Sequence, residues 1–303
     1  MNDCDILCIG EPLVEFSQID GTEWRHGFGG DVSNVAIAAA RLGARSAIAT
    51  SLGDDGFGRE LRQLWDSEGV DASMVSIDAT APTGIYFVRH GADGHSFEYR
   101  RAGSAASRMT PETLPMAAIE SARYTHVSGI TLAISASARD AGLQAMRTAR
   151  AAGRRVSFDP NLRLALWTLE DAKPVINEAL SLAHIALPGL DDARQLTGLH
   201  APEDIVRAIH DLGPEIVALT LGEEGALLGV DGDLSHVPGI SVQAVDATGA
   251  GDCFDGAFLA RLAAGDTPEA ACRYAVAASA LSVAGFGAVT PLPRATEVEA
   301  SLV

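Results

Sequence analysis

Lysine is almost missing from this chain of 303 residues, because Lys173 is the only one and Pro174 follows it. A Walker P-loop needs a Gly-Lys-Ser or Gly-Lys-Thr string, and a protein kinase needs a strand lysine that pairs with phosphates. A lone lysine before a proline fits neither pattern. The sequence therefore excludes a P-loop nucleoside triphosphatase and leaves a protein kinase without a catalytic lysine.

Positive charge in general is scarce, with 22 Lys and Arg residues against 40 Asp and Glu residues and a formal net charge of −18. Nucleic acids and anionic membranes attract basic surfaces, so we expect neither of them as a partner. An acidic surface does not attract ATP either. Any phosphate site must therefore be a local feature of the fold.

Cysteine and long apolar runs are also rare. The 4 cysteines, at positions 4, 8, 253 and 272, form no Cys-x-x-Cys pair, which predicts reduced thiols. The first five residues carry two acids, so we expect no signal peptide. No apolar run approaches the roughly 20 residues of a membrane span. Together these absences predict a cytoplasmic protein.

The most informative stretch is Val245–Leu262, which reads V-D-A-T-G-A-G-D-C-F-D-G-A-F-L-A-R-L. An apolar strand is expected to end over Ile240–Val245, and the chain then turns at Gly249 and Gly251. Apolar residues recur afterwards at helical spacing, which predicts a helix from about Ala250. The unpaired N–H groups at the start of such a helix favour an anion, phosphate above all.

Asp252 falls in the first turn of this predicted helix, where a carboxylate would repel a bound phosphate. The combination is useful when the carboxylate takes a proton from a nucleophile that attacks the phosphate. An aspartate in a first turn is also common as a partner of helix N–H groups and of the helix dipole. A dinucleotide G-x-G-x-x-G motif from Gly249 would need glycine where Phe254 stands, which weakens the alternative of a dinucleotide-dependent oxidoreductase.

Strands and helices alternate along most of the chain. The alternation starts with a strand over Asp5–Gly10, a helix capped by Asp31 or Ser33, a strand over Ser46–Ser51 and a helix over Phe57–Gly69. The later expected strands are Tyr124–Ser128, Arg155–Phe158, His184–Leu187, Ile216–Leu221, Ala226–Val230 and Leu234–Pro238, and the later helices are Ser135–Ala152, Glu170–Ala183, Leu190–Thr197, Glu203–Leu212, Thr267–Ala284 and a short terminal helix. This pattern predicts an α/β fold with a doubly wound, mostly parallel sheet flanked by helices.

Two segments interrupt the alternation. Thr83–His90 and Ser96–Arg101 read as strands joined by the turn signal Gly91–Gly94. A hairpin inside an α/β alternation usually lies outside the main sheet. We therefore expect a small β lid formed from about 11–28 and 83–103, within a single domain that covers 1–303 because no interior linker is rich enough in Pro and Gly to divide it.

Four side chains are candidates for contact with a ligand under this lid. Tyr86, Tyr99 and Arg101 would face a cleft, although ordinary strand amphipathicity also explains them. Arg163 follows a predicted strand at the edge where doubly wound folds bind ligands, and its planar fork suits a carboxylate. A solvated loop arginine is the alternative interpretation.

Two strings connect the chain with a known family. Gly29–Asn34 with the following Arg41-Leu42-Gly43, and Asp246–Asp252, are similar to the signatures of the ribokinase-like (PfkB) carbohydrate kinases, and the likeness covers essentially the whole chain. Within that family the chain looks most like the 2-keto-3-deoxygluconate kinases. The strings that carry this closer likeness are Gly10–Leu13, Tyr99–Ser107, Ser128–Thr131 and Asp159–Arg163.

The resemblance implies an ATP- and Mg²⁺-dependent kinase that phosphorylates the terminal hydroxyl of a sugar acid. It implies that Asp252 is the catalytic base and that Gly249, Ala250 and Gly251 form the anion hole. The substrate contacts that it implies are Gly30, Asn34, Tyr86, Tyr99, Arg101 and Arg163. The nucleotide contacts that it implies are Asp192, Thr220, Gly222, Gly225, Gly249, Gly251 and Gly287. A homo-oligomer formed through the lid is a further expectation from the family.

The nucleotide side departs from the family pattern. The usual Asn-x-x-Glu that helps to hold magnesium corresponds to Gly189 and Asp192, of which only Asp192 has a side chain that could serve. Thr220 stands where a basic residue is often found. Asp246 and Thr248 match part of a monovalent-cation site, expected for K⁺, although turn capping explains both.

Alternatives remain open. A kinase for a neutral sugar such as fructose or ribose, or for a nucleoside, would share the base and the anion hole, although it would not need two arginines for a carboxylate. A non-catalytic sugar or nucleotide sensor on the same fold would be expected to lack the base, yet Asp252 is present. The sequence does not distinguish 2-keto-3-deoxygluconate from its C4 epimer.

Overall fold

The computed structural model describes residues 4–91 and 94–302, and its main feature is a nine-stranded sheet. The strands are β1 (Ile6–Ile9), β4 (Ser46–Gly53), β5 (Val75–Asp78), β8 (Tyr124–Ser128), β9 (Arg155–Asp159), β10 (Ile185–Ala186), β11 (Ile216–Thr220), β12 (Gly225–Val230) and β13 (Asp233–Pro238), in the order β13-β12-β11-β10-β9-β8-β1-β4-β5. All pairs from β11 to β5 are parallel, and β12 and β13 are antiparallel additions at one edge. The predicted mostly parallel α/β fold is confirmed.

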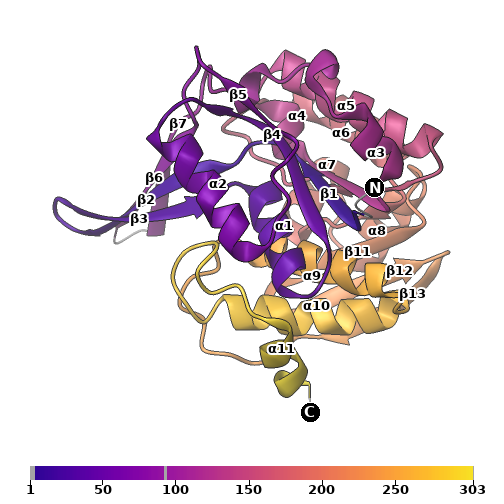
Figure 1. Cartoon of the computed structure of the whole chain (residues 1–303). Coiled ribbons are helices and arrows are strands. Elements are labelled where there is room, and N and C mark those ends of the chain that lie inside the picture. Colours follow the sequence, from indigo (N-terminus) through magenta and orange to yellow (C-terminus); the bar gives the residue numbers. More distant parts are fainter. Residues whose placement is uncertain (1–3, 92–93, 303) are drawn as a thin grey trace.

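Helices cover both faces of this sheet (Figure 1). The helices are α1 (Asp31–Arg41), α2 (Gly56–Glu68), α3 (Met116–Ser121), α4 (Gly129–Ala133), α5 (Ala136–Ala151), α6 (Leu169–Leu182), α7 (Leu190–Thr197), α8 (Pro202–His210), α9 (Ala250–Ala264), α10 (Pro268–Ser282) and α11 (Ala295–Ser301), and single 3₁₀ turns lie at Ala106–Arg108, Pro111–Thr113 and Gly222–Glu224. Because side chains alternate along a strand, Ile6 and Cys8 of β1 pack into the core with α1, α9 and α10, whereas Leu7 and Ile9 pack into the core with α5, α6 and α8.

A second sheet projects from the body of the molecule, on the left in Figure 1. It has four strands, β2 (Leu13–Asp20), β3 (Glu23–Gly29), β6 (Ile85–Gly91) and β7 (Gly94–Arg100), in the order β3-β2-β6-β7. These strands lie in the two segments expected to form a lid. The turn residues 92–93 lie outside the described part of the chain.

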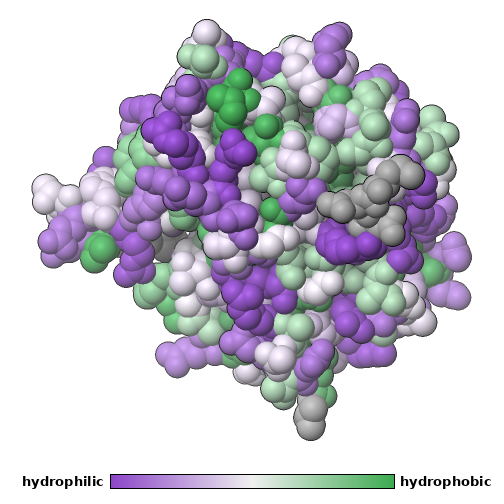
Figure 2. All heavy atoms as spheres, in the orientation of Figure 1, coloured by the Kyte–Doolittle hydropathy of each residue, from purple (hydrophilic) through white to green (hydrophobic). Residues whose placement is uncertain are grey.

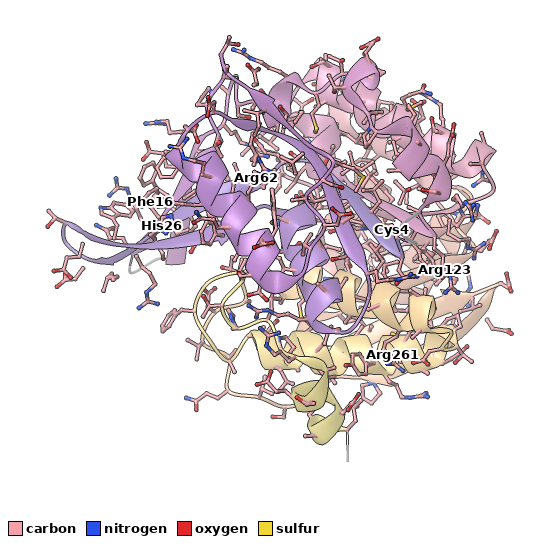
Figure 3. The ribbon with its side chains drawn as sticks, in the orientation of Figure 1. Cys4, Phe16, His26, Arg62, Arg123 and Arg261 are labelled. Carbon is pink, nitrogen blue, oxygen red and sulfur yellow. The ribbon has the colours of Figure 1, made fainter. Side chains whose placement is uncertain are left out.

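The two faces of this lid sheet carry different side chains. One face is aromatic: Phe16 stacks on Phe87 at 5.5 Å between ring centroids and meets the His26 ring edge at 5.5 Å (Figure 3). The opposite face presents Leu13, Tyr86, Val88 and Tyr99, which form a small cluster of their own. Only the second face reaches the cavity described below.

Helices α1 and α9 approach each other closely because α9 has a glycine at the contact. A Cβ on Gly256 would lie 2.7 Å from the Cβ of Ala38 and 2.7 Å from the carbonyl oxygen of Val35. A larger residue would force the helices apart. This contact brings Asn34 of α1 beside Asp252 of α9, where the two side chains hydrogen-bond.

Some expectations about local structure are wrong. No strand forms over Ile240–Val245, where the chain is largely exposed and pairs with no neighbouring strand of the described chain. Neither Asp31 nor Ser33 caps α1, because Gly30 is the N-cap and makes no side-chain bond. The side chain of Asp31 instead accepts a hydrogen bond from Asn161 at 3.2 Å, and Ser33 accepts one from Trp65 at 2.9 Å.

The surface mixes hydrophilic and apolar side chains over the face shown in Figure 2. Within the described residues, no helix has the length and apolar character required to cross a bilayer. All four cysteines are free thiols, and three of them are buried. The cytoplasmic location and the single-domain organisation stay predictions.

Candidate active site

A cavity of about 920 Å³ opens at the carboxyl edge of the parallel strands. It is lined by residues that directly follow β1, β8, β9 and β10, by the end of β11, and by the start of α9. The lid contributes Leu13, Tyr86, Phe97 and Tyr99. This edge is where doubly wound sheets bind ligands, because loops from several strands converge there.

Asp252 lines this cavity from the first turn of α9. Its Oδ2 accepts a hydrogen bond of 2.7 Å from Nδ2 of Asn34. Burial and the nearby Asp31 carboxylate raise the pKa of Asp252 to about 7, against the opposing effects of Asn34 and Arg163. A carboxylate with a pKa near neutrality is suited to accept a proton from an alcohol at physiological pH.

Free amides lie beside this carboxylate. Gly249 is the N-cap of α9 and adopts a left-handed conformation with φ 77°, which glycine reaches without strain. The N–H of Ala250 already donates to the carbonyl of Ala247 at 3.2 Å, so it is less available than its neighbours. Among described residues, the N–H groups of Gly251 and Asp252 have no acceptor. The helix start can therefore bind an anion next to the candidate base.

The floor of the cavity holds acids that sequence reasoning did not identify as site residues: Asp31, Asp159 and Asp255 are all buried. Burial raises the pKa of Asp159 and of Asp255 well above the ordinary value, and repulsion from Asp252 adds to the shift of both. One oxygen each of Asp31, Asn34 and Asp255 is buried without a hydrogen-bond partner in the described chain. The floor therefore offers acceptors to a ligand rich in hydroxyl donors. The only signals in the sequence were the i, i+3 spacing of Asp252 and Asp255 and the strand-end position of Asp159.

Arg101 reaches the cavity from the end of β7, but its charge is already paired. Its Nε donates to Oε2 of Glu11 at 2.6 Å, and its Nη2 also meets that oxygen. Glu11 is fully buried and accepts a further hydrogen bond from Ser104. Arg101 was expected to supply positive charge to a carboxylate; in the structure its guanidinium is already half of a buried ion pair, and its contact with substrate stays a prediction.

Arg163 is the more accessible arginine of the cavity. Half of its side chain is exposed, and its Nη1 lies 3.5 Å from Oδ2 of Asp192. The same oxygen accepts a hydrogen bond from the Leu162 N–H at 2.9 Å. Burial raises the pKa of the Asp192 carboxyl. Arg163 and Asp192 thus stand together at the cavity wall.

A second cavity, of about 460 Å³, adjoins the first. Glycine, alanine and other small or apolar residues line most of it, and Glu223 is the only ionisable side chain in its wall within the described chain. The expected nucleotide residues Thr220, Gly222 and Gly225 all contribute to this wall. The residues shared by the two cavities are Thr220, Ala244, Ala247, Ala250 and Gly251. The start of α9 is therefore the boundary between the two spaces.

The structure places the expected substrate residues together. Gly30, Asn34, Tyr86, Tyr99, Arg101 and Arg163 all line the larger cavity, as do Asp192, Gly249, Asp246 and Thr248.

Gly287 lines neither cavity, although its N–H donates to Oδ2 of Asp246 at 2.9 Å. Oδ1 of Asp246 accepts from both the N–H and the hydroxyl of Thr248, at 2.9 and 2.6 Å. This is the turn-capping arrangement, and it leaves the expected K⁺ site as a prediction.

Comparison with known proteins gives consistent matches over the full length. The family described as pfkB family carbohydrate kinase matches residues 4–295. A 2-dehydro-3-deoxygluconokinase of Thermoproteus tenax is 37% identical over 97% of this chain and 93% of its own. A fructokinase-1 of Oryza sativa subsp. japonica is 35% identical over 97% of this chain and 96% of its own. A putative ribokinase II of E. coli, solved in complex with ATP and Mg²⁺, is 27% identical and superposes with a TM-score of 0.91 over 99% of both chains.

Proposed function

Because the chain belongs to the pfkB family of carbohydrate kinases and is a sugar kinase, we propose that it phosphorylates the terminal hydroxyl of a sugar acid, converting 2-keto-3-deoxygluconate to its 6-phosphate. One observation carries the proposal. Asp252, with a pKa raised to about 7, faces the larger cavity beside free amides at the boundary with the smaller one. An alcohol in one space and a phosphate in the other would meet at this carboxylate.

The chemistry follows from that geometry. The sugar occupies the larger cavity under the lid, with its terminal hydroxyl at Asp252. Asp252 accepts the hydroxyl proton as the oxygen attacks the γ-phosphorus of ATP, and the bond from that phosphorus to the bridging oxygen breaks, so that ADP leaves. The N–H groups of Gly251 and Asp252 then stabilise the negative charge on the phosphoryl group during transfer. Gly249 and Ala250 shape the turn that directs these amides.

ATP is assigned to the smaller cavity, bordered by Thr220, Gly222 and Gly225. Among described residues no cluster of three His, Cys, Asp or Glu side chains could hold a metal ion by itself. This fits Mg²⁺, which prefers phosphate oxygens, water and one or two carboxylates to an all-protein cage. Asp192 is the side chain of the cavity wall that we assign to its neighbourhood, and Mg²⁺ would supply neutralisation of phosphate charge.

The substrate class rests on the arginines. Arg163 offers an exposed guanidinium to a carboxylate, and Arg101 retains N–H groups beyond those used by Glu11. A neutral sugar is the second candidate, since fructokinases are nearly as similar as 2-dehydro-3-deoxygluconokinases. The pairing of Arg101 with Glu11 favours this second candidate, because the Glu11 carboxylate already neutralises the charge of that arginine.

A panel of substrates tests the proposal. ADP release should be measured with ATP and each of 2-keto-3-deoxygluconate, its C4 epimer, other aldonic acids, fructose, ribose and a nucleoside. We expect the highest kcat/KM for 2-keto-3-deoxygluconate. A higher kcat/KM for fructose would replace the sugar acid by the neutral sugar. No ADP release with any of these acceptors would refute the proposed reaction. Repeating the assay with K⁺ replaced by a large organic cation tests the predicted K⁺ site.

A further inference from the structure

The inner face of the lid holds a buried hydrogen bond that the proposed reaction does not use. The hydroxyl of Tyr86, on β6, donates to Oε2 of Glu15, on the adjacent β2. Tyr86 and Glu15 are each only 5% exposed. Tyr86 lines the larger cavity, whereas Glu15 lies behind it and does not. Glu15 can therefore act on a substrate only through Tyr86.

The neighbouring strand is built to accommodate this bond. Glu15 pairs with Gly27 and Leu13 pairs with Gly29 in the ladder between β2 and β3. A Cβ at Gly29 would collide with the Tyr86 hydroxyl, and a Cβ at Gly27 would lie 3.5 Å from Oε1 of Glu15. On this face of β3 glycine therefore stands at the two positions that lie opposite the bond. The absence of side chains there leaves room for it.

The tyrosine ring is held in place from its other sides. It stacks on Tyr99 at 5.8 Å between ring centroids and packs with Leu13 and Val88. A ring fixed in this way cannot move its hydroxyl to a second position without breaking the packing. The single O–H proton of a tyrosine can be donated to one acceptor at a time. While it is donated to Glu15, the phenolic oxygen offers only lone pairs to the cavity.

We propose that Glu15 is a positioning residue that makes Tyr86 a hydrogen-bond acceptor toward the substrate. The substrate group beside Tyr86 is then a hydroxyl that donates, and neither a carboxylate nor a keto oxygen. This inference rests on the proposed function for the presence of a sugar in the cavity. It also constrains the orientation of the bound sugar: an acid substrate must place its carboxylate away from Tyr86, toward Arg163.

The first test needs no substrate. The chain has only 4 tyrosines, so ¹³Cζ-tyrosine labelling gives few NMR signals, and Tyr86→Phe assigns the one of interest. Donation to a carboxylate shifts the Cζ resonance. We expect that resonance to move in Glu15→Leu, which removes the acceptor. The resonance should keep its wild-type position in Glu23→Gln, a control at an exposed position of β3. An unchanged Tyr86 signal in a folded Glu15→Leu protein would overturn the proposal, whatever the enzyme phosphorylates.

The second test measures discrimination. For the sugar that turns over best, each hydroxyl is replaced in turn by fluorine, which cannot donate a hydrogen bond. At the hydroxyl beside Tyr86 we expect kcat/KM of the wild type to fall about tenfold to a hundredfold, as for an unsatisfied buried hydrogen bond. Glu15→Gln keeps an acceptor for the Tyr86 hydroxyl, so the ratio of kcat/KM between the parent sugar and its fluorinated analogue should stay as in the wild type. Glu15→Leu frees the O–H of Tyr86 to donate, so the ratio should collapse toward one.

A purely structural role for Glu15 would lower kcat/KM for the parent sugar and its fluorinated analogue alike and leave their ratio unchanged, which would contradict the proposal. In the Tyr86→Phe background the substitution Glu15→Leu should have no further effect on the ratio. If no sugar in the panel is phosphorylated, the proposed function fails by itself. The NMR comparison then decides on Glu15 independently.

Discussion

The two adjoining cavities of this kinase are lined by different kinds of residue. The larger one is lined by long, charged and aromatic side chains, including seven carboxylates and two arginines among its described lining residues. The smaller one is lined mostly by glycine, alanine, serine and apolar residues, with Glu223 as its only ionisable side chain in the described chain. Sugar recognition is therefore a matter of side-chain chemistry, whereas the assigned nucleotide side relies on the shape of the backbone.

Substitutions in the two cavities should therefore affect different kinetic parameters. Removing a functional group from the larger cavity should change the chemical step or the affinity for one class of sugar. Changing the volume of the smaller cavity should affect ATP alone. A substitution in one cavity that changed the kinetics of the other ligand would contradict this division.

The largest effect is expected at the boundary of the two cavities. Asp252→Asn removes the carboxylate that we assign as acceptor of the hydroxyl proton, so kcat should fall by about 10²–10⁴-fold. KM for both substrates should change little, because the amide keeps the size of the side chain. Steady-state kinetics by ADP release measures both. Turnover near that of the wild type would remove Asp252 from the role of base.

A stability measurement serves as the control for this variant. The pKa of Asp252 is raised from 3.8 to about 7, so between these pH values the folded protein holds a proton that the unfolded chain releases. Stability from this group is thus lost as the pH rises through about 7. Asp252→Asn should then be at least as stable as the wild type above that pH, and Asp140→Asn, at an exposed position of α5, should match the wild type.

The next effect belongs to the larger cavity alone. Arg163→Ala should raise KM for a sugar acid by about tenfold to a hundredfold, because a charge-assisted hydrogen bond to the carboxylate is lost. KM for ATP and for a neutral sugar should change less than threefold by the same reasoning. Arg62→Ala on α2, whose side chain is exposed and labelled in Figure 3, is the matched control. Equal increases for the acid and for ATP would assign Arg163 to phosphate instead.

A smaller effect is expected on the nucleotide side. Ala280→Leu adds three carbon atoms to a residue in the wall of the smaller cavity, and should raise KM for ATP several-fold by overfilling the space. KM for the sugar should stay constant. Ala264→Leu, at the exposed end of α9, makes the same chemical change away from the cavity. A change in KM for the sugar but not for ATP would reverse the assignment of the two cavities.

The smallest effect is a displacement of the pH profile. With Asp252 as base, kcat/KM should decline as the pH falls below about 7, since the protonated carboxyl cannot accept a proton. The hydrogen bond from Asn34 lowers this pKa, so Asn34→Ala should move the acid limb to higher pH. Asn177→Ala, at an exposed position of α6, should leave the limb in place. A limb that moves to lower pH would show that Asn34 does not stabilise the ionised base.

The sheet and the position of the candidate base could be predicted from the sequence for physical reasons that are local. Strand and helix periods repeat within a few residues, and the glycine turn before Asp252 is contiguous in the chain. The strand expected over Ile240–Val245 failed because its apolar residues lie beside the smaller cavity, where no partner strand is available. Strand formation depends on such a partner, which a short apolar pattern does not reveal.

The rest of the site depends on contacts between distant positions. The pair of Glu11 and Arg101 joins residues 90 positions apart, so the sequence showed an arginine but not that its charge was already matched. Asp159 and Asp255 lie far apart in the sequence and come close only in the folded protein. Pairing and burial of this kind decide whether a charged side chain is free to bind a ligand, and neither can be read from composition or periodicity.

Gly256 helps to set the geometry of the reaction centre, because it allows α1 and α9 to approach closely. The α1–α9 contact sets the distance between Asp252, the candidate base, and the side-chain amide of Asn34. The position of the base therefore depends on the packing of two helices and not on a loop. Loops around the site can then differ without moving the candidate base. An added methyl group at position 256, which lines neither cavity, should by contrast separate α1 from α9 and displace Asp252 from Asn34.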